Sequence, residues 1–125
     1  MTKQRDVAVA AGARPANRPP SPNDPVQVDG DLLHLIPALL ASRLQLTLDM
    51  DAALAAGDRE KLRGLAHRAG GGLAIYGYAW AAWACRQVEL QAAAGEPASL
   101  SGQIASVRSH LEAQQQKSQP QAAGS

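Results

Sequence analysis

The stretch of sequence that decides the fold reads REKLRGLAHRAGGGL and runs from Arg59 to Leu73. Its apolar residues fall at positions i, i+4, i+7 and i+11, which is the spacing of the buried stripe of an amphipathic helix. They are Leu62, Ala66, Ala69 and Leu73, with Leu65 beside them. His67 lies off this stripe, and the three glycines at 70–72 follow it. Because each glycine costs a helix about 1 kcal/mol relative to alanine, either the helix ends there or a partner approaches the backbone beside His67.

The chain before this stretch has a second helical pattern. Between residues 28 and 56, leucines and other apolar residues recur at mostly helical spacing. Pro37 lies near the start of this segment, so it either kinks the helix or separates a short first helix from a longer one. Gly57 suits the position just after a helix, and Asp58 suits the N-cap of the next helix.

Two further helical patterns follow the glycines. The first covers about residues 78–94, and the second begins at Ser99 or Ser101 and ends near residue 113. Small residues dominate the facing stripes of the two middle helices, which predicts that these helices pack closely. Short connections between the helices predict an all-α fold: an antiparallel four-helix bundle with an additional short N-terminal helix or a kinked first helix.

The composition agrees with packed helices and excludes several classes of protein. Of the 125 residues, 46% are hydrophobic, and phenylalanine is absent. A net charge of +1 gives no strong attraction to nucleic acid, and the single Cys85 excludes an internal disulfide and a cysteine metal cluster. The longest uncharged window, Ala69–Cys85, would span only about 25 Å as a helix, which is short of a bilayer. We therefore expect a cytoplasmic monomer that binds neither nucleic acid nor membrane.

The two ends of the chain differ in composition from the middle. Residues 1–27 contain five of the eight prolines and predict a disordered, proline-rich tail. Residues 28–114 are the expected helical bundle. Residues 115–125 are rich in glutamine, alanine and serine, and they predict a disordered C-terminal tail.

His67 is the candidate functional residue. Its position off the apolar stripe predicts exposure, and an exposed neutral imidazole is a nucleophile. Arg63 and Arg68 lie close enough in the sequence to hold an anion beside it, while Gly70 and Gly71 leave room for a partner. No cluster of carboxylates lies near His67 in the sequence, so we expect no metal site there. An ordinary surface histidine is the alternative interpretation.

The other histidines and the tryptophans are less specific. His34 and His110 lie in helical patterns without adjacent glycines, and we interpret both as ordinary. Trp80 and Trp83 lie three residues apart. They predict either packing at the end of the bundle or a partly exposed docking patch.

The residues around His67 have the spacing of a known motif. Ala66 precedes the histidine, Gly71 follows it by four residues, and Gly77 follows it by ten. Further on come a cysteine, an apolar residue followed by glutamate, and a small residue, namely Cys85, Val88, Glu89 and Ala92. Together these residues resemble the histidine-containing phosphotransfer (HPt) domains of bacterial two-component phosphorelays.

The resemblance implies a phosphoryl carrier rather than an autonomous enzyme. His67 would accept a phosphoryl group from the aspartate of one receiver domain and pass it to another, with Arg63, Arg68, Gly70 and Gly71 around the phosphate or the receiver. The chain itself would bind no cofactor, because the Mg²⁺ would be held by the receiver. The partners would be receiver domains of response regulators or of a hybrid histidine kinase.

One position departs from the family pattern. The family usually has lysine three residues after the histidine, where this chain has Gly70, so Arg63 or Arg68 would have to replace it. The alternatives are a degenerate HPt-like bundle that binds a receiver or kinase without efficient phosphotransfer, or an unrelated helical adaptor or membrane-associated protein. The spacing on both sides of His67 favours close approach by a partner, and it predicts that the helix continues toward Tyr76.

Overall fold

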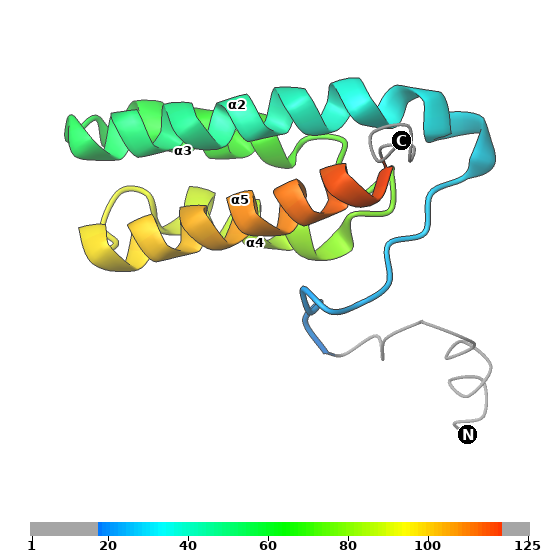
Figure 1. Cartoon of the computed structure of the whole chain (residues 1–125). Helices are drawn as coiled ribbons and strands as arrows, with labels where there is room; N and C mark the ends of the chain where they lie inside the picture. Colours follow the sequence, from blue (N-terminus) through cyan, green and yellow to red (C-terminus); the bar gives the residue numbers. More distant parts are fainter. Residues whose placement is uncertain (1–17, 119–125) are drawn as a thin grey trace.

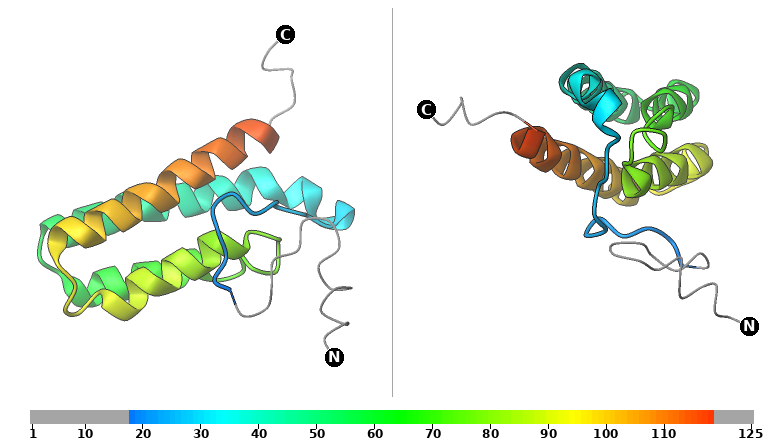
Figure 2. Two further views of the ribbon diagram at one scale, coloured as in Figure 1. Left: turned by 90° about the horizontal axis from the view of Figure 1, so that it is seen from below. Right: turned by 90° about the vertical axis from the view of Figure 1, so that its right-hand side faces the viewer.

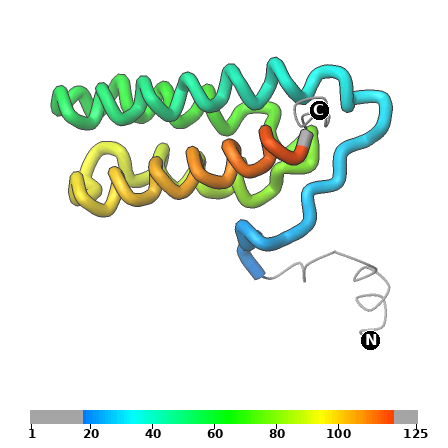
Figure 3. Tube along the Cα trace, in the orientation of Figure 1, coloured from blue at the N-terminus to red at the C-terminus, as the bar shows by residue number. Residues whose placement is uncertain are grey.

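The computed structural model describes residues 18–118, whose α-helices form a ring of four around one core (Figure 1). In chain order the elements are the 3₁₀ helix η1 (Gly30–Leu35) and the α-helices α2 (Ile36–Ala55), α3 (Arg59–Gly70), α4 (Ala79–Gln91) and α5 (Pro97–Ser118). Helix α2 packs against α3 and α5, and α4 packs against the same two helices. The right-hand view of Figure 2 shows this ring end-on, and Figure 3 shows the chain reversing direction between consecutive α-helices. The predicted antiparallel four-helix bundle is confirmed.

Pro37 and the pair Gly57-Asp58 explain where the first helices begin and end. Proline lacks a backbone N–H and is tolerated in the first turn of an α-helix, which is where Pro37 lies in α2, directly after η1. Beyond the other end of α2, Gly57 has a φ of +75°. The Asp58 side chain accepts a 3.1 Å hydrogen bond from the Lys61 N–H and caps α3.

The apolar stripes predicted for α3 and α5 are buried in the middle of the ring. One polar cluster joins α2 to α5 beside this core. The buried Thr47 hydroxyl donates to the Leu44 carbonyl at 2.7 Å and accepts from Arg108 Nε at 3.1 Å. Arg108 also donates to the Thr47 carbonyl and to the Asp51 carboxylate. The buried hydroxyl is therefore paired, as burial of a polar group requires.

Helix α3 ends at Gly70, so the prediction that it continues toward Tyr76 is wrong. Arg43 of α2 stabilises this end, because its guanidinium donates to the Ala69 carbonyl at 3.2 Å and also to the Gly71 carbonyl. The Ala69 carbonyl belongs to the last turn of α3 and Gly71 is its C-cap, so neither carbonyl has an intrahelical partner. The glycines thus end the helix, and an arginine from the neighbouring helix provides hydrogen bonds to the carbonyls at that end.

Residues 71–77 form turns that need glycine at two places. Gly72 has a φ of +82° and Gly77 a φ of +95°, which side chains strongly disfavour. A Cβ placed on Gly77 would also lie 2.3 Å from the carbonyl oxygen of Gln27. Gly77 therefore lets the segment before η1 cross the start of α4.

The ends of the bundle differ from their predicted boundaries. Helix α5 continues to Ser118, past the boundary predicted at residue 114. Residues 1–17 and 119–125 of the predicted tails lie outside the described residues. Val26 and Val28, which precede η1, pack against the core. Within the described part of the chain, no helix combines the length and the apolar character that crossing a bilayer requires.

Candidate functional site

A hollow of about 260 Å³ lies between α3 and α4, and His67 lines it. We call it the histidine hollow, and its lining residues are Ala66, His67, Gly70, Gly71, Ala82, Arg86 and Glu89. Small residues make up more than half of this set. The hollow is therefore wide enough at the surface for another group to reach the imidazole.

His67 is exposed, and one of its two ring nitrogens is paired. Its side chain is 71% exposed, and Nδ1 lies 3.0 Å from Oε2 of Glu89, a side chain that is only 17% exposed. An ionised carboxylate can only accept, so the contact places the proton on Nδ1. In the neutral ring Nε2 then has a free lone pair, and it has no partner among residues 18–118. This arrangement orients the imidazole and presents Nε2 as a nucleophile.

Gly70 and Gly71 both line the hollow, but for different reasons. A Cβ on Gly70 would lie 3.1 Å from Cβ of Cys85, a tight contact, so α3 and α4 approach each other closely here. A Cβ on Gly71 would make only ordinary contacts, with the Arg68 and His67 carbonyl oxygens at 3.5 and 3.7 Å. The close packing predicted for the two middle helices is thus present at Gly70, whereas a side chain at Gly71 would not be crowded.

The two arginines predicted beside His67 do not line the hollow. Arg63 precedes His67 by one helical turn and bonds the Glu60 carboxylate at 2.5 Å. This hydrogen bond and the opposite charge raise the pKa of Arg63 and lower that of Glu60. Arg68 is exposed, and as the next residue it points about 100° around the helix from His67.

Two residues of the hollow, Arg86 and Glu89, were not predicted as site residues. With Ala82 they fall at i, i+4 and i+7, so they share one face of α4, and α3 lies against it. Glu89 places one carboxylate, not a cluster, beside His67. Within residues 18–118 no group of three or more His, Cys, Asp or Glu side chains could hold a metal ion. The helical spacing on α4 was the signal that could have identified both residues.

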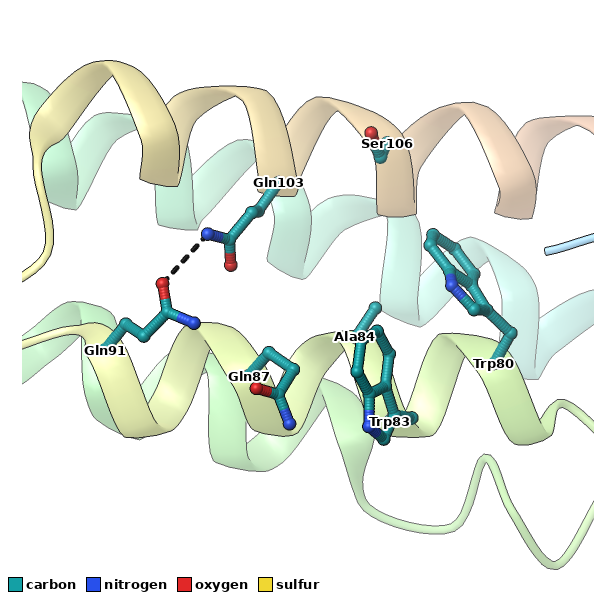
Figure 4. Close-up of a pocket in the computed structure, with 7 residues that line it drawn as sticks. All are labelled: Trp80, Trp83, Ala84, Gln87, Gln91, Gln103 and Ser106. Atoms are coloured by element: carbon teal, nitrogen blue, oxygen red, sulfur yellow. Dashed lines mark hydrogen bonds between the residues drawn. The ribbon is translucent and has the colours of Figure 1, made fainter. Parts of the chain in front are cut away.

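A second hollow, also of about 260 Å³, lies on the other side of α4, between α4 and α5. Figure 4 shows the side chains that line this tryptophan hollow: Trp80, Trp83, Ala84, Gln87, Gln91, Gln103 and Ser106. The Gln103 amide donates to Oε1 of Gln91 at 2.9 Å, which links the two helices. Indoles, amides and one hydroxyl make up its polar chemistry, and none of these groups titrates near neutral pH.

His110 is a packed histidine next to the tryptophan hollow. Its ring centre lies 4.9 Å from that of Trp80, and Nε2 is buried without a hydrogen-bond partner among the described residues. Burial lowers the pKa of His110, and the charge of Lys117 adds to this effect. Trp80 therefore has the packing role that the sequence allowed, whereas Trp83 is 39% exposed. The remaining histidine, His34, lies on η1 and is exposed.

Comparison with known proteins identifies no relative: no family model, no curated protein and no solved structure matches this chain.

Proposed function

We propose that this chain is a phosphorelay intermediate, which accepts a phosphoryl group on His67 from the aspartate of one receiver domain and passes it to the aspartate of another. One observation carries the proposal. An exposed imidazole has its Nδ1 held by Glu89 and its Nε2 unpaired, beside a hollow that is walled by small residues. Such a site can take a group from one macromolecule and offer it to the next.

The transfer needs little from this chain beyond position and charge. Nε2 of His67 attacks phosphorus, the P–O bond to the receiver aspartate breaks, and the carboxylate leaves with the bonding electrons. The ring then carries a positive charge, which the Glu89 carboxylate stabilises through the Nδ1–H. A carboxylate of the second receiver attacks phosphorus in turn, and the bond to Nε2 breaks. Positioning and neutralisation of charge dominate such transfers.

The partners supply the rest of the chemistry. In the HPt family pattern the receiver holds a Mg²⁺ ion that neutralises charge on the phosphoryl group. This chain is then a carrier rather than an autonomous enzyme, and it works with receivers of response regulators or of a hybrid histidine kinase in the cytoplasm. The second candidate function is a bundle that binds a receiver or kinase without efficient transfer. Gly70 favours this alternative, because no lysine follows His67 by one turn.

A transfer assay tests both functions. The chain is incubated with a panel of ³²P-labelled receiver domains and Mg²⁺, and the label on the chain is followed with time. We expect an acid-labile, base-stable label that is abolished in His67→Gln and retained in His34→Gln, a matched change at another exposed histidine. Both variants should melt at the wild-type temperature, since both side chains are exposed. Receiver binding without label in the wild type would support the second function, and label on His67→Gln would refute the first.

A further inference from the structure

We propose that Arg86, on α4, binds the phosphoryl group that His67 carries and so provides the cation that is absent at position 70. The inference rests on the proposed function of His67. It assigns a role to a residue of the neighbouring helix, and three independent features of the histidine hollow support it.

The packing at Gly70 is the first feature. A side chain there would begin 3.1 Å from Cβ of Cys85 and 3.6 Å from the Ala82 carbonyl oxygen. The 3.6 Å contact is ordinary, but the 3.1 Å contact is tight, so α4 would have to give by a few tenths of an ångström. The same close approach that crowds a side chain at position 70 brings the Ala82–Arg86–Glu89 face of α4 up to His67. A cation on α4 can therefore reach the space that a lysine on α3 would have used.

The second feature is that three other arginines near α3 are already hydrogen-bonded to other groups. Arg43 donates to the Ala69 and Gly71 carbonyls, and Arg63 bonds Glu60. Arg59 donates to the Ala92 and Gly95 carbonyls at 2.8 and 3.0 Å, at the far end of α3 from His67. Arg86 alone among the described cations lines the histidine hollow. It is exposed, and no hydrogen bond or ion pair within residues 18–118 holds its guanidinium.

The charge of the hollow is the third feature. A phosphoryl group brings roughly two negative charges, and here it would arrive beside the carboxylate of Glu89. The negative charges of the phosphoryl group and of Glu89 repel each other, and this repulsion opposes transfer unless a cation lies between them or beside them. A guanidinium is suited to this, because it can donate two parallel hydrogen bonds to phosphate oxygens while keeping its charge. The cost of removing Arg86 should therefore depend on the charge of Glu89.

A small phosphodonor separates phosphoryl binding from receiver docking. With phosphoramidate, Nε2 of His67 attacks phosphorus, the P–N bond of the donor breaks, and ammonia leaves with the bonding electrons. The ³¹P NMR signal of the product reports both the rate of phosphorylation and the surroundings of the phosphoryl group. We expect Arg86→Ala to slow labelling about 10- to 100-fold and to shift the phosphohistidine resonance. Arg86→Lys should recover part of the rate, because it keeps the charge but loses the fork geometry.

Two controls make the test specific. Arg68→Ala removes another exposed arginine, one that does not line the hollow, and it should change the rate by less than about twofold. In a Glu89→Gln background, which keeps an acceptor for Nδ1 but removes the charge, Arg86→Ala should cost several-fold less than in the wild type. A role of Arg86 in folding alone would not produce that coupling, and melting temperatures check folding directly.

The possible results distinguish the role of Arg86 from the role of His67 as phosphoacceptor. Labelling of Arg86→Ala at the wild-type rate, with an unshifted resonance, would overturn the role of Arg86 and leave His67 as the phosphoacceptor. Equal losses in Arg86→Ala and Arg68→Ala would also overturn it, because they would reflect overall charge. Absence of label on wild-type His67 from both phosphoramidate and receivers would overturn the proposed function, and the role of Arg86 with it.

Discussion

The two hollows beside α4 have the same volume, about 260 Å³, but different chemistry. The histidine hollow contains an imidazole, a carboxylate and a guanidinium among small residues. The tryptophan hollow contains two indoles, three amides and a hydroxyl. Helix α4 contributes one wall to each hollow. On the side toward α3 this wall consists of Ala82, Arg86 and Glu89, and on the side toward α5 it consists of Trp80, Trp83, Gln87 and Gln91.

The size of a hollow alone therefore does not identify a reactive site. Each hollow has a histidine in or beside it, yet the two rings are in opposite situations. His67 is 71% exposed and paired at one nitrogen by Glu89, whereas His110 is packed against Trp80 and its lowered pKa keeps it neutral. A nucleophile needs access and orientation together, and only the histidine hollow provides both.

Filling each hollow in turn with a larger side chain tests whether only the histidine hollow is needed for transfer, and it has the largest expected effect. Gly71→Leu should reduce transfer from receivers by at least about 100-fold, because the side chain fills the approach to His67 and small misplacements already cost this much. The fold should tolerate it, since Gly71 has φ −63° and ψ 128°, which any residue adopts, and its Cβ would have only ordinary contacts. The measurement is the initial rate of label transfer, with the melting temperature as a check.

Ser106→Leu is the matched change in the tryptophan hollow. It adds a similar side chain at another exposed position, and we expect transfer to change by less than about twofold. If Ser106→Leu slowed transfer as much as Gly71→Leu did, receivers would contact both sides of α4. The functional distinction between the hollows would then be wrong.

Gly77 tests what the two hollows share, because it fixes the start of α4. Gly77→Ala should lower the free energy of unfolding by about 2 kcal/mol, since it forces a φ of +95° on alanine and places Cβ against the Gln27 backbone. Gly64→Ala, in the interior of α3 with no atom within 4 Å of the new Cβ, should instead add about 0.5 to 1 kcal/mol. Urea unfolding of both variants measures the contrast. Equal stability of the two variants would mean that the crossing at Gln27 contributes nothing.

The helical fold could be predicted because each helix follows from local rules. The stripe from Leu62 to Leu73 has a helical period, and Gly57-Asp58 has the chemistry of a helix boundary, so both were found in the sequence. The end of α3 could not be placed in the same way. It depends on Arg43, which lies 26 residues before Ala69 and reaches its carbonyl only in the folded bundle. The spacing of residues around His67 suggested a continuous helix, whereas the turns need positive φ at Gly72 and Gly77.

The site was predicted in part for the same reason. The exposure of His67 follows from its place off a helical stripe, and the structure agrees. Which residues of α4 lie beside His67 depends on how α3 and α4 pack, and the sequence pattern of a single helix does not determine this. Arg63 and Arg68 were chosen because they are near in sequence, but Arg86 and Glu89 are the charged residues in the hollow. Contact between helices thus decides the electrostatics of the site.

Cys85 gives a smaller predicted effect on stability than Gly77, and it concerns the core face of α4 between the two hollows. Burial raises the pKa of its thiol from 9.0 to about 12, with the charge of Arg43 opposing this slightly. Because the folded pKa is the higher one, this contribution to stability is complete below pH 9 and is lost as the pH rises from 9 toward 12. The loss should be about 1 kcal/mol at pH 10.

Cys85→Ala isolates this contribution. The alanine has no thiol to ionise, so the difference in unfolding free energy between pH 7 and pH 10 should be smaller by about 1 kcal/mol in the variant, even though its stability at pH 7 also changes. A residual alkaline loss is expected from Tyr78, whose pKa burial also raises. Identical pH dependence in the two proteins would mean that the thiol titrates freely in the folded state. Helix α4 would then open near Gly70 without global unfolding, and the close α3–α4 contact that separates the two hollows would be a transient feature.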